Sequence, residues 1–321
     1  MSIFLYILSH NIIPIFALVA LGFLLGKKFE LHIFSLSKLL FYLFIPAFIF
    51  VNLYITELKM DMLTIFLCGL LILITNDLVA RVVARIRHYD VGLTNAFKNS
   101  IMFNNSGNIG VSLITLIFTS GPFVINGQTP YLHQAITAQI IILVLQNMSV
   151  NTLGFYNAGR ATLSVRDSIK KMVSMPSLYV IMLALICKIM PLDLTATTLW
   201  PVLDYLKNGL VPMALVTLGV QLAKTQFNFK SMDVHLSVFI KLIVAPLLAF
   251  VYIHALGLTG IIAQTIFIAH AVPTAVNTAL IAVEYDSYKD FASQAVMVST
   301  LCSGVTLTLA IYTAAIMFPA Q

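Results

Sequence analysis

The sequence predicts an all-α polytopic membrane protein with ten transmembrane helices, and three observations lead to this class. Of the 321 residues, 60% are hydrophobic and only 9% are charged. A soluble globular domain has about 45–50% apolar and about 25% charged residues. The chain falls into ten apolar segments, each near the roughly 20 residues with which a helix crosses a bilayer. The fourth and ninth segments are interrupted by polar residues together with glycine or proline.

The ten segments are joined by short connections, except in the middle of the chain. The longest polar stretch follows the fifth segment and is rich in arginine and lysine. We therefore predict a first five-helix repeat over residues 1–157, a cytoplasmic linker over residues 158–174 and a second five-helix repeat over residues 175–321. The N-terminal sequence lacks the basic region and cleavage site of a signal peptide, so we interpret it as the start of the first helix. The predicted helices cover residues 3–26, 33–54, 62–84, 95–118, 131–155, 175–192, 198–222, 235–257, 260–283 and 292–317.

The basic residues indicate how the helices are oriented. Loops after odd-numbered helices carry most of the lysines and arginines, and the other loops carry few. By the positive-inside rule the basic loops are cytoplasmic, so both termini are extracytoplasmic. Because each half has an odd number of helices, the halves cross the membrane in opposite senses and would form inverted repeats. One offset of 166 residues (273 minus 107, and 212 minus 46) pairs Gly107 with Pro273 and Pro46 with Pro212.

The fourth and ninth helices are predicted to break near their middles. Residues 104–108 place amides, a hydroxyl and a glycine in the fourth helix, and Pro273 removes a helical hydrogen bond from the ninth. An unpaired backbone group in hydrocarbon costs several kcal/mol, so a break must line a cavity or be buried in protein. Taken alone, the first break is equally compatible with a polar kink packed against a neighbouring helix. Two breaks in corresponding positions favour a transporter's site near the membrane midplane.

The chemistry of the two breaks favours an anion. The N-terminal ends of half-helices present unpaired N–H groups and partial positive charge, where anions bind. No lysine or arginine lies within either break, which predicts a weakly held anion. Amides in the fifth helix are further candidates, although such amides also tie neighbouring helices together. The predicted substrate-binding residues are Asn104, Asn105, Ser106, Gly107, Asn108, Gln146, Asn147, Pro273, Thr274 and Asn277.

Three ionisable residues inside the helices are candidates for ion coupling, because charged groups are expensive to bury in a membrane. Asp77 and Arg81 are four residues apart and can pair along one helix face. They either neutralise each other near the cytoplasmic end, or Asp77 binds a coupling proton or sodium ion. His270 precedes the proline break and either changes charge near neutral pH or serves as a hydrogen-bonding core residue.

Three other charged residues in the helices are expected to have structural roles. Lys241 lies about two turns into the predicted eighth helix. Its long side chain either reaches the membrane surface, which we expect, or has a functional role inside the bundle. Asp204 and Lys207 are three residues apart and are expected to form a structural pair close to the outer surface.

The sequence has no signature of catalysis or of a cofactor site. The metalloprotease, serine-hydrolase and phosphate-loop motifs are absent, as is any basic-aromatic pattern for nucleic acid. The three cysteines lie in apolar segments without metal-ligand spacing. We therefore predict no enzymatic activity, no cofactor, no metal site and no nucleic-acid partner. The expected partners are a small organic anion and the lipid bilayer.

The sequence resembles the auxin efflux carrier family, whose bacterial members are described as malate or malonate permeases and which is related to the bile-acid/sodium symporters. The fourth-helix pattern of an aromatic residue, Asn-Thr-Gly and Gly-x-Pro-Leu appears as Phe103, residues 105–107 and residues 110–113. Within it, Ser112 stands where the family usually has proline. The ninth-helix pattern Pro-Thr-Ala-Val-Asn is intact at residues 273–277. The likeness covers the whole chain and includes Pro14, Phe41, Tyr42, Pro46, Gln146, Asn147, Pro212, Glu284, Tyr285 and the run from Ala292 to Thr300.

The resemblance implies ten helices in two inverted five-helix repeats, with helices four and nine broken and crossing. It implies a scaffold of helices one, two, six and seven, an elevator-type movement of the remaining helices, and a homodimer. By the same resemblance, Asn105 and Gln146 match positions that lie at the substrate in the plant members of the family. Asp77 and Arg81 match a support site at which related sodium symporters bind the ion. The short linker makes plant-type regulation by phosphorylation of a large loop unexpected.

We therefore predict a secondary active transporter of small organic anions, mono- or dicarboxylates such as malate or malonate, in the plasma membrane. Transport would be coupled to a proton gradient, to a sodium gradient or to neither. A sodium-coupled organic anion symporter of the bile-acid type is the first alternative, and dependence on sodium would distinguish it. A membrane sensor that binds the ligand without transporting it is the second alternative.

Overall fold

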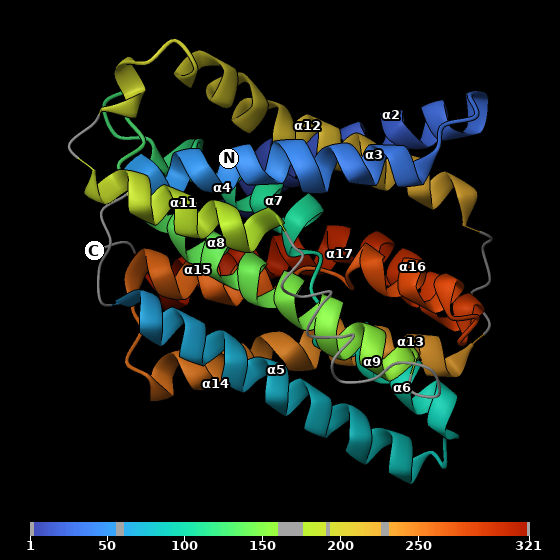
Figure 1. Ribbon diagram of the computed structural model, residues 1–321. Coiled ribbons are helices and arrows are strands. Elements are labelled where there is room, and N and C mark those ends of the chain that lie inside the picture. Colours follow the sequence, from blue (N-terminus) through green and yellow to red (C-terminus); the bar gives the residue numbers. More distant parts are fainter. Residues whose placement is uncertain (1–2, 56–60, 160–175, 191–192, 226–230, 320–321) are drawn as a thin grey trace.

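The computed structural model describes residues 3–55, 61–159, 176–190, 193–225 and 231–319 (Figure 1). Regular secondary structure in these residues is helical, apart from two isolated antiparallel bridges that join Asn104 to Thr274 and Ile125 to Gln128. The all-α prediction is therefore confirmed for this part of the chain. Nearly all of the predicted linker at 158–174 lies outside the described residues.

The first half of the chain forms five helical rods, of which the fourth is broken. Several rods contain a π-helical turn that continues the α-helix on either side of it. The elements are α1 (Ile3–Ile7), η1 (Leu8–Ile12), α2 (Ile13–Lys28), α3 (Ile33–Leu39), η2 (Leu40–Phe44), α4 (Ile45–Ile55), α5 (Asp61–Ile86), α6 (Val91–Met102), η3 (Ser106–Gly110), α7 (Val111–Phe118), η4 (Gly121–Phe123), α8 (Leu132–Ser149), η5 (Val150–Gly154) and α9 (Phe155–Ala158).

The described residues of the second half also form helical rods, and the rod that contains α15 and α16 is broken. The elements are α11 (Pro176–Ile189), η6 (Leu194–Ala196), α12 (Trp200–Lys224), α13 (Met232–Phe239), η7 (Ile240–Val244), α14 (Ala245–Ala255), α15 (Gly260–Ala271), α16 (Val276–Glu284) and α17 (Lys289–Met317). Helices occupy all ten predicted positions, with ends that differ by only a few residues.

Local sequence signals account for several helix ends. The Asp90 carboxylate caps α6 by accepting a hydrogen bond from the N–H of Leu93 at 2.8 Å. The Ser231 hydroxyl caps α13 in the same way. Lys27 and Lys28 end α2, where positive charge is favourable at the negative end of the helix dipole.

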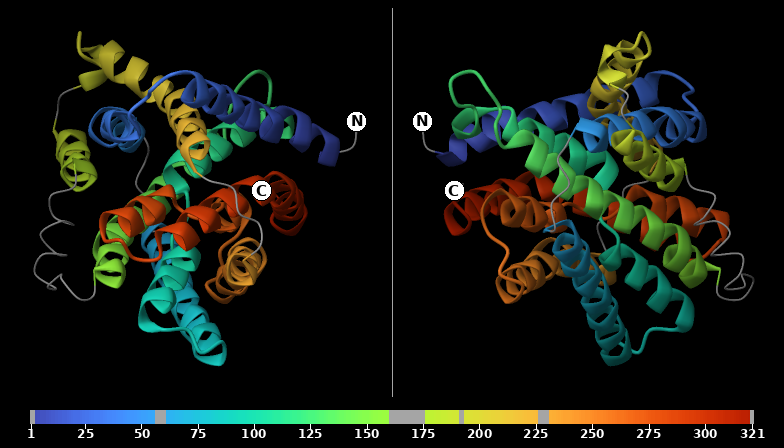
Figure 2. Two further views of the ribbon diagram at one scale, coloured as in Figure 1. Left: turned by 90° about the vertical axis from the view of Figure 1, so that its right-hand side faces the viewer. Right: turned by 60° about the vertical axis from the view of Figure 1, so that its left-hand side comes forward.

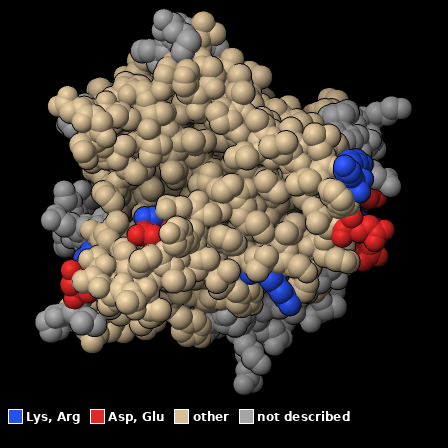
Figure 3. All heavy atoms as spheres, turned by 90° about the horizontal axis from the view of Figure 1, so that it is seen from above, with Lys and Arg blue, Asp and Glu red and all other residues tan. Residues whose placement is uncertain are grey.

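Seven helices are long and apolar enough to cross a membrane, judged by length and composition among the described residues. Figure 3 shows a broad face of the molecule on which Lys, Arg, Asp and Glu occupy only small patches toward the edges. Large apolar side chains such as those of Phe34, Leu63 and Tyr205 are exposed over the helices. Such extensive exposed apolar surface is expected where lipid, and not water, surrounds the protein. The prediction of a polytopic membrane protein is thus supported by the length of the apolar helices and by the apolar surface that they expose.

The helices form two groups (Figures 1 and 2). In one group α2 and α4 pack against α12, and α11 packs against α4. In the other group lie α5, α6, α8 and the helices from α13 to α17. The two broken rods belong to this second group. One consists of α6 and α7, and the other of α15 and α16.

Glycines allow α2 and α12 to approach backbone to backbone. A Cβ atom on Gly219 would lie 2.0 Å from the carbonyl oxygen of Val19, and one on Gly22 would lie 2.2 Å from that of Val216. Gly26, one turn further along α2, faces the Cα of Val220 in the same way. Small residues one turn apart are the usual means by which membrane helices pack closely, because van der Waals contact is the main attraction between them.

We expect Gly219→Ala to destabilise the protein by about 1–3 kcal/mol, the usual cost of overpacking, since the added methyl group would meet backbone atoms. Gly304→Ala is the matched control, because its Cβ would lie 3.4 Å from the nearest atom, in the ring of Phe16. Thermal unfolding of the purified proteins in detergent measures both. An equal melting temperature for Gly219→Ala and the wild type would contradict the close α2–α12 contact.

Candidate functional site

The two broken rods meet at their breaks. After α6 the chain leaves the helix over residues 103–105, and after α15 it leaves the helix over residues 272–275. These segments cross antiparallel: the N–H of Asn105 donates to the carbonyl of Pro273 at 2.8 Å, and the N–H of Ala275 donates to the carbonyl of Phe103 at 2.9 Å. Each break thus supplies partners for backbone groups that the other leaves free. This mutual pairing lets both helices open inside an apolar bundle.

Asn104 lies at the centre of this crossing and is buried. Its backbone N–H donates to Gln146 Oε1 at 3.0 Å, and its side-chain Nδ2 donates to the carbonyl of Ala269 at 3.1 Å. Opposite it, the Thr274 hydroxyl donates to the carbonyl of Ser100 at 2.8 Å, and the Thr274 N–H donates to the Ser299 hydroxyl. Side chains from α8 and α17 therefore hold the crossing in place.

A small cleft opens beside the crossing. Of the ten predicted substrate-binding residues, eight line it; Pro273 and Thr274 do not, and instead make the hydrogen bonds that hold the crossing. The cleft thereby joins the first break, the start of α16 and the amides of α8. Its lining residues are Phe41, Ile45, Phe103, Asn104, Asn105, Ser106, Gly107, Asn108, Gln146, Asn147, Val150, Ala275, Val276 and Asn277.

Hydrogen-bond donors are left over in this cleft. Asn105 Nδ2, Ser106 Oγ and Asn147 Nδ2 are buried and have no hydrogen-bond partner among the described residues. Asn105 Oδ1, by contrast, accepts from the N–H of Asn108. A buried donor without a partner is costly, so a ligand with acceptor oxygens gains from filling it. The helix α16 also starts at this cleft without a side-chain cap, which leaves its positive end for an anion.

Gln139 supports the same region from outside the cleft. Its Nε2 donates to the carbonyl of Ser106 at 3.0 Å. A Cβ on Gly110 would lie 2.6 Å from that nitrogen, so glycine is needed there for the amide to approach. Gln139 therefore positions the start of η3, on which Ser106 and Gly107 lie.

The prediction for Lys241 is wrong. Its ammonium does not reach the membrane surface: the residue is 0% exposed. Nζ donates to the carbonyl of Ile101 at 3.2 Å and to Asn104 Oδ1. Lys241 lies in the π-helical turn Ile240–Val244, between α13 and α14. The crossing thus has a lysine beside it, although neither break contains a basic residue.

Asp77 and Arg81 form the predicted pair, with Arg81 Nε 2.5 Å from Asp77 Oδ2. A third charge, which the sequence interpretation missed, joins them: Lys98 Nζ lies 2.9 Å from Asp77 Oδ1 and 3.2 Å from Asn157 Oδ1. Lys98 is buried, whereas Arg81 is mostly exposed. The signal was present, because Lys98 is an ionisable residue inside a predicted helix.

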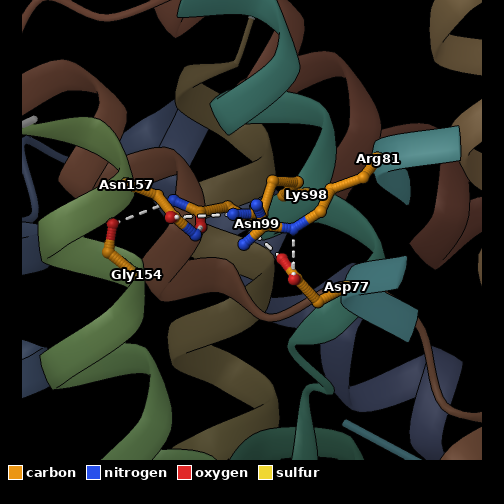
Figure 4. A network of polar contacts seen from close by, with 6 residues as sticks. All are labelled: Asp77, Arg81, Lys98, Asn99, Gly154 and Asn157. Carbon is orange, nitrogen blue, oxygen red and sulfur yellow. Dashed lines mark hydrogen bonds and ion pairs between the residues drawn. The ribbon is translucent and has the colours of Figure 1, made fainter. Parts of the chain in front are cut away.

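Amides extend this network away from the charges (Figure 4). Asn157 Nδ2 donates to Asn99 Oδ1 at 2.8 Å, and Asn99 Nδ2 donates to the carbonyl of Gly154 at 3.0 Å. The network ties α6 to the end of the α8–α9 rod. A cavity with about 880 Å³ of empty volume lies beside it and is lined by Leu70, Leu73, Ile74, Asp77, Arg81, Asn95, Lys98, Met102, Leu153, Tyr156 and Asn157.

His270 and the Asp204–Lys207 pair lie outside both cavities. His270 is buried, its Nδ1 is 2.8 Å from the carbonyl of Ile266, and its Nε2 has no hydrogen-bond partner among the described residues. Its coupling role stays a prediction. Lys207 Nζ lies 2.8 Å from Asp204 Oδ1, so the predicted structural pair is confirmed.

The loop before α6 forms hydrogen bonds with the first turn of α13 and with the residue before α17. Tyr89 donates to Asp233 Oδ1 at 2.6 Å, and burial raises the pKa of Tyr89 to about 12. Tyr288 donates to Asp90, and this hydrogen bond lowers the pKa of the Asp90 carboxyl. These contacts fix the starts of α6, α13 and α17 relative to one another at the end of the bundle.

Comparison with known proteins agrees with a transport protein. Residues 160–311 match the family described as membrane transport protein. The chain is 25% identical over 309 residues to an "Uncharacterized transporter" of Methanothermobacter thermautotrophicus, covering 94% of this chain and 96% of that protein. It is 32% identical over 114 residues to a "Putative malonate transporter" of Rhizobium meliloti, covering 34% of this chain and 35% of that protein.

These matches agree with the fold and with the resemblance found in the two breaks. The family match covers the second half of the chain, including the second break, and the archaeal relative extends the similarity to almost the whole length. The second half of the chain therefore matches the membrane transport protein family, and almost the whole chain is similar to a protein described as a transporter.

Proposed function

We propose that the protein is a secondary active transporter of small organic anions, mono- or dicarboxylates such as malate or malonate. The observation that carries this proposal is the cleft at the crossing, where Asn105, Ser106 and Asn147 present buried donors without partners. A carboxylate has only acceptor oxygens and can satisfy several such donors together. The local similarity to a protein described as a malonate transporter favours a dicarboxylate.

The proposed architecture is ten transmembrane helices in two inverted repeats, residues 1–157 and 175–321, joined by the linker at 158–174. Helix contacts support this architecture. If each helix is replaced by its counterpart in the other half, one observed contact becomes another observed contact. The contact of α2 with α12 has its counterpart in that of α11 with α4, and the contact of α7 with α8 has its counterpart in that of α16 with α17. An elevator-type movement would then carry the crossing past a scaffold formed by α2, α4, α11 and α12.

We propose a proton gradient, and not a sodium gradient, as the driving force. The Asp77 carboxylate already has two cationic partners, Arg81 and Lys98. A sodium ion at this carboxylate would have to displace a buried ammonium group, which is costly. The sodium-coupled symporter therefore remains the second candidate. As part of the same proposal, the protein is a homodimer in the plasma membrane, and both of its termini are extracytoplasmic.

Uptake of labelled malate, malonate and indole-3-acetate into proteoliposomes tests the proposal, with a proton or a sodium gradient imposed separately. We expect malonate or malate uptake under the proton gradient only. Pro273→Ala should reduce it about tenfold or more, which corresponds to about 1.4 kcal/mol, because alanine lets α15 continue and shifts the partner of Asn105. Uptake under the sodium gradient alone would favour the symporter. Binding without flux under either gradient would favour the sensor.

A further inference from the structure

Lys241 is a fully buried lysine without a carboxylate partner among the described residues. Its ammonium contacts two neutral oxygens, the carbonyl of Ile101 and Asn104 Oδ1, and no carboxylate among the described residues lies within ion-pair distance. Lys98 is almost as deeply buried but has Asp77 at 2.9 Å. The protein thus balances one of these two buried lysines and leaves the other unbalanced.

An unbalanced charge in a low-dielectric interior is expensive, and neutral acceptors recover only part of the lost hydration. An anion nearby recovers much more, because water does not screen the attraction there. Lys241 therefore marks a place where an anionic group is favoured.

The nearest place open to a ligand is the cleft at the crossing. Asn104 lines this cleft and also accepts the hydrogen bond of Lys241. The N–H of Asn104 is in turn held by Gln146, another lining residue. A single side chain thus separates the ammonium from the cleft.

His270 is a buried titratable group on α15, the helix that leads into the second break. Only its Nδ1 is placed to donate, to the carbonyl of Ile266, while Nε2 is buried without a partner among the described residues. This is the pattern of a neutral ring with its proton on Nδ1. Lys241, and not His270, is therefore the group that can supply a positive charge when an anion is bound at the crossing.

We propose that Lys241 is the charge partner of the transported anion: it balances one negative charge of the substrate in the cleft and acts through Asn104. The inference rests on the proposed function and deepens it. The charge of a bound monoanion and that of a protonated Lys241 sum to zero. With a bound dianion, the sum is one negative charge. Lys241 is a positioning residue, since Asn104 stands between it and the ligand.

Counterflow of labelled malonate in proteoliposomes tests this, with the membrane potential set by a potassium gradient and valinomycin. We compare the wild type with Lys241→Met, Lys241→Arg and the control Lys207→Met. We expect Lys241→Met to raise KM for malonate about tenfold and to make counterflow depend more steeply on membrane potential, because the loaded carrier then has one more negative charge. Lys241→Arg keeps the charge and should therefore keep the wild-type potential dependence, and the control Lys207→Met should keep both KM and the potential dependence.

A purely structural role would lower the amount of folded protein or the maximal rate without changing KM or the potential dependence, and that result overturns the inference. Wild-type protein provides a second test that needs no variant: malonate should raise its melting temperature, and neutral malonamide should not. Equal stabilisation by both also overturns it. If wild-type protein shows no malonate counterflow at all, the proposed function fails first, and the inference fails with it.

Discussion

Asn105→Asp should reduce malonate uptake by about a hundredfold or more, while the protein still inserts and folds. The new carboxylate keeps the oxygen that accepts from the N–H of Asn108, so the start of η3 remains capped. It removes the Nδ2 donor, which has no partner among the described residues. It also places a negative charge in the cleft, and a like charge beside a bound anion costs several kcal/mol. Initial rates of uptake, scaled to the amount of reconstituted protein, measure the effect.

Two variants separate charge from folding at this position. Asn105→Ala loses the donor and the cap of η3 but adds no charge, so it should lose transport while the protein still inserts and folds, with a modestly lower melting temperature. Asn126→Asp makes the same chemical change at an exposed loop position and should transport normally. Full activity of Asn105→Asp or Asn105→Ala would move the site away from the first break.

Asp77→Asn should destabilise the protein by about 3–5 kcal/mol, the cost of leaving one partner of a buried ion pair alone. Lys98→Met should cost less, because Asp77 keeps Arg81 as a partner. The side chains of Lys98 and Asp77 are only 7% and 18% exposed, and their charged atoms are 2.9 Å apart. The double variant should recover most of this loss, because methionine and asparagine leave no buried charge. Thermal or chemical unfolding in detergent provides the double-mutant cycle.

The matched control is the pair of Asp204 and Lys207, whose charged atoms are 2.8 Å apart but whose side chains are 37% and 24% exposed. Its single variants, Asp204→Asn and Lys207→Met, should cost no more than about 1 kcal/mol, as is usual for exposed ion pairs. Additive losses in the Asp77 and Lys98 cycle would show that the two side chains do not depend on each other.

The positions of the helices and of the two breaks follow from the sequence alone. Runs of apolar residues require helices, since a backbone in hydrocarbon must satisfy its own hydrogen bonds. Pro273 and the polar residues 104–108 interrupt such runs, so the breaks are local properties of the chain. The amide-rich lining of the cleft could be predicted for the same reason. The Asp77–Arg81 pair followed from the four-residue spacing on one helix.

The partners of the buried lysines were decided by the tertiary structure. Lys241 is 137 residues from Asn104, and no periodic pattern states which helix a lysine will face. Sequence reasoning allowed its long side chain to reach the membrane surface, but packing of η7 against the crossing closes that path. Likewise, only the antiparallel crossing shows that Pro273 and Thr274 hold the site and do not line it. Local sequence fixes where a helix must open, whereas the packing of distant helices decides which charges meet there.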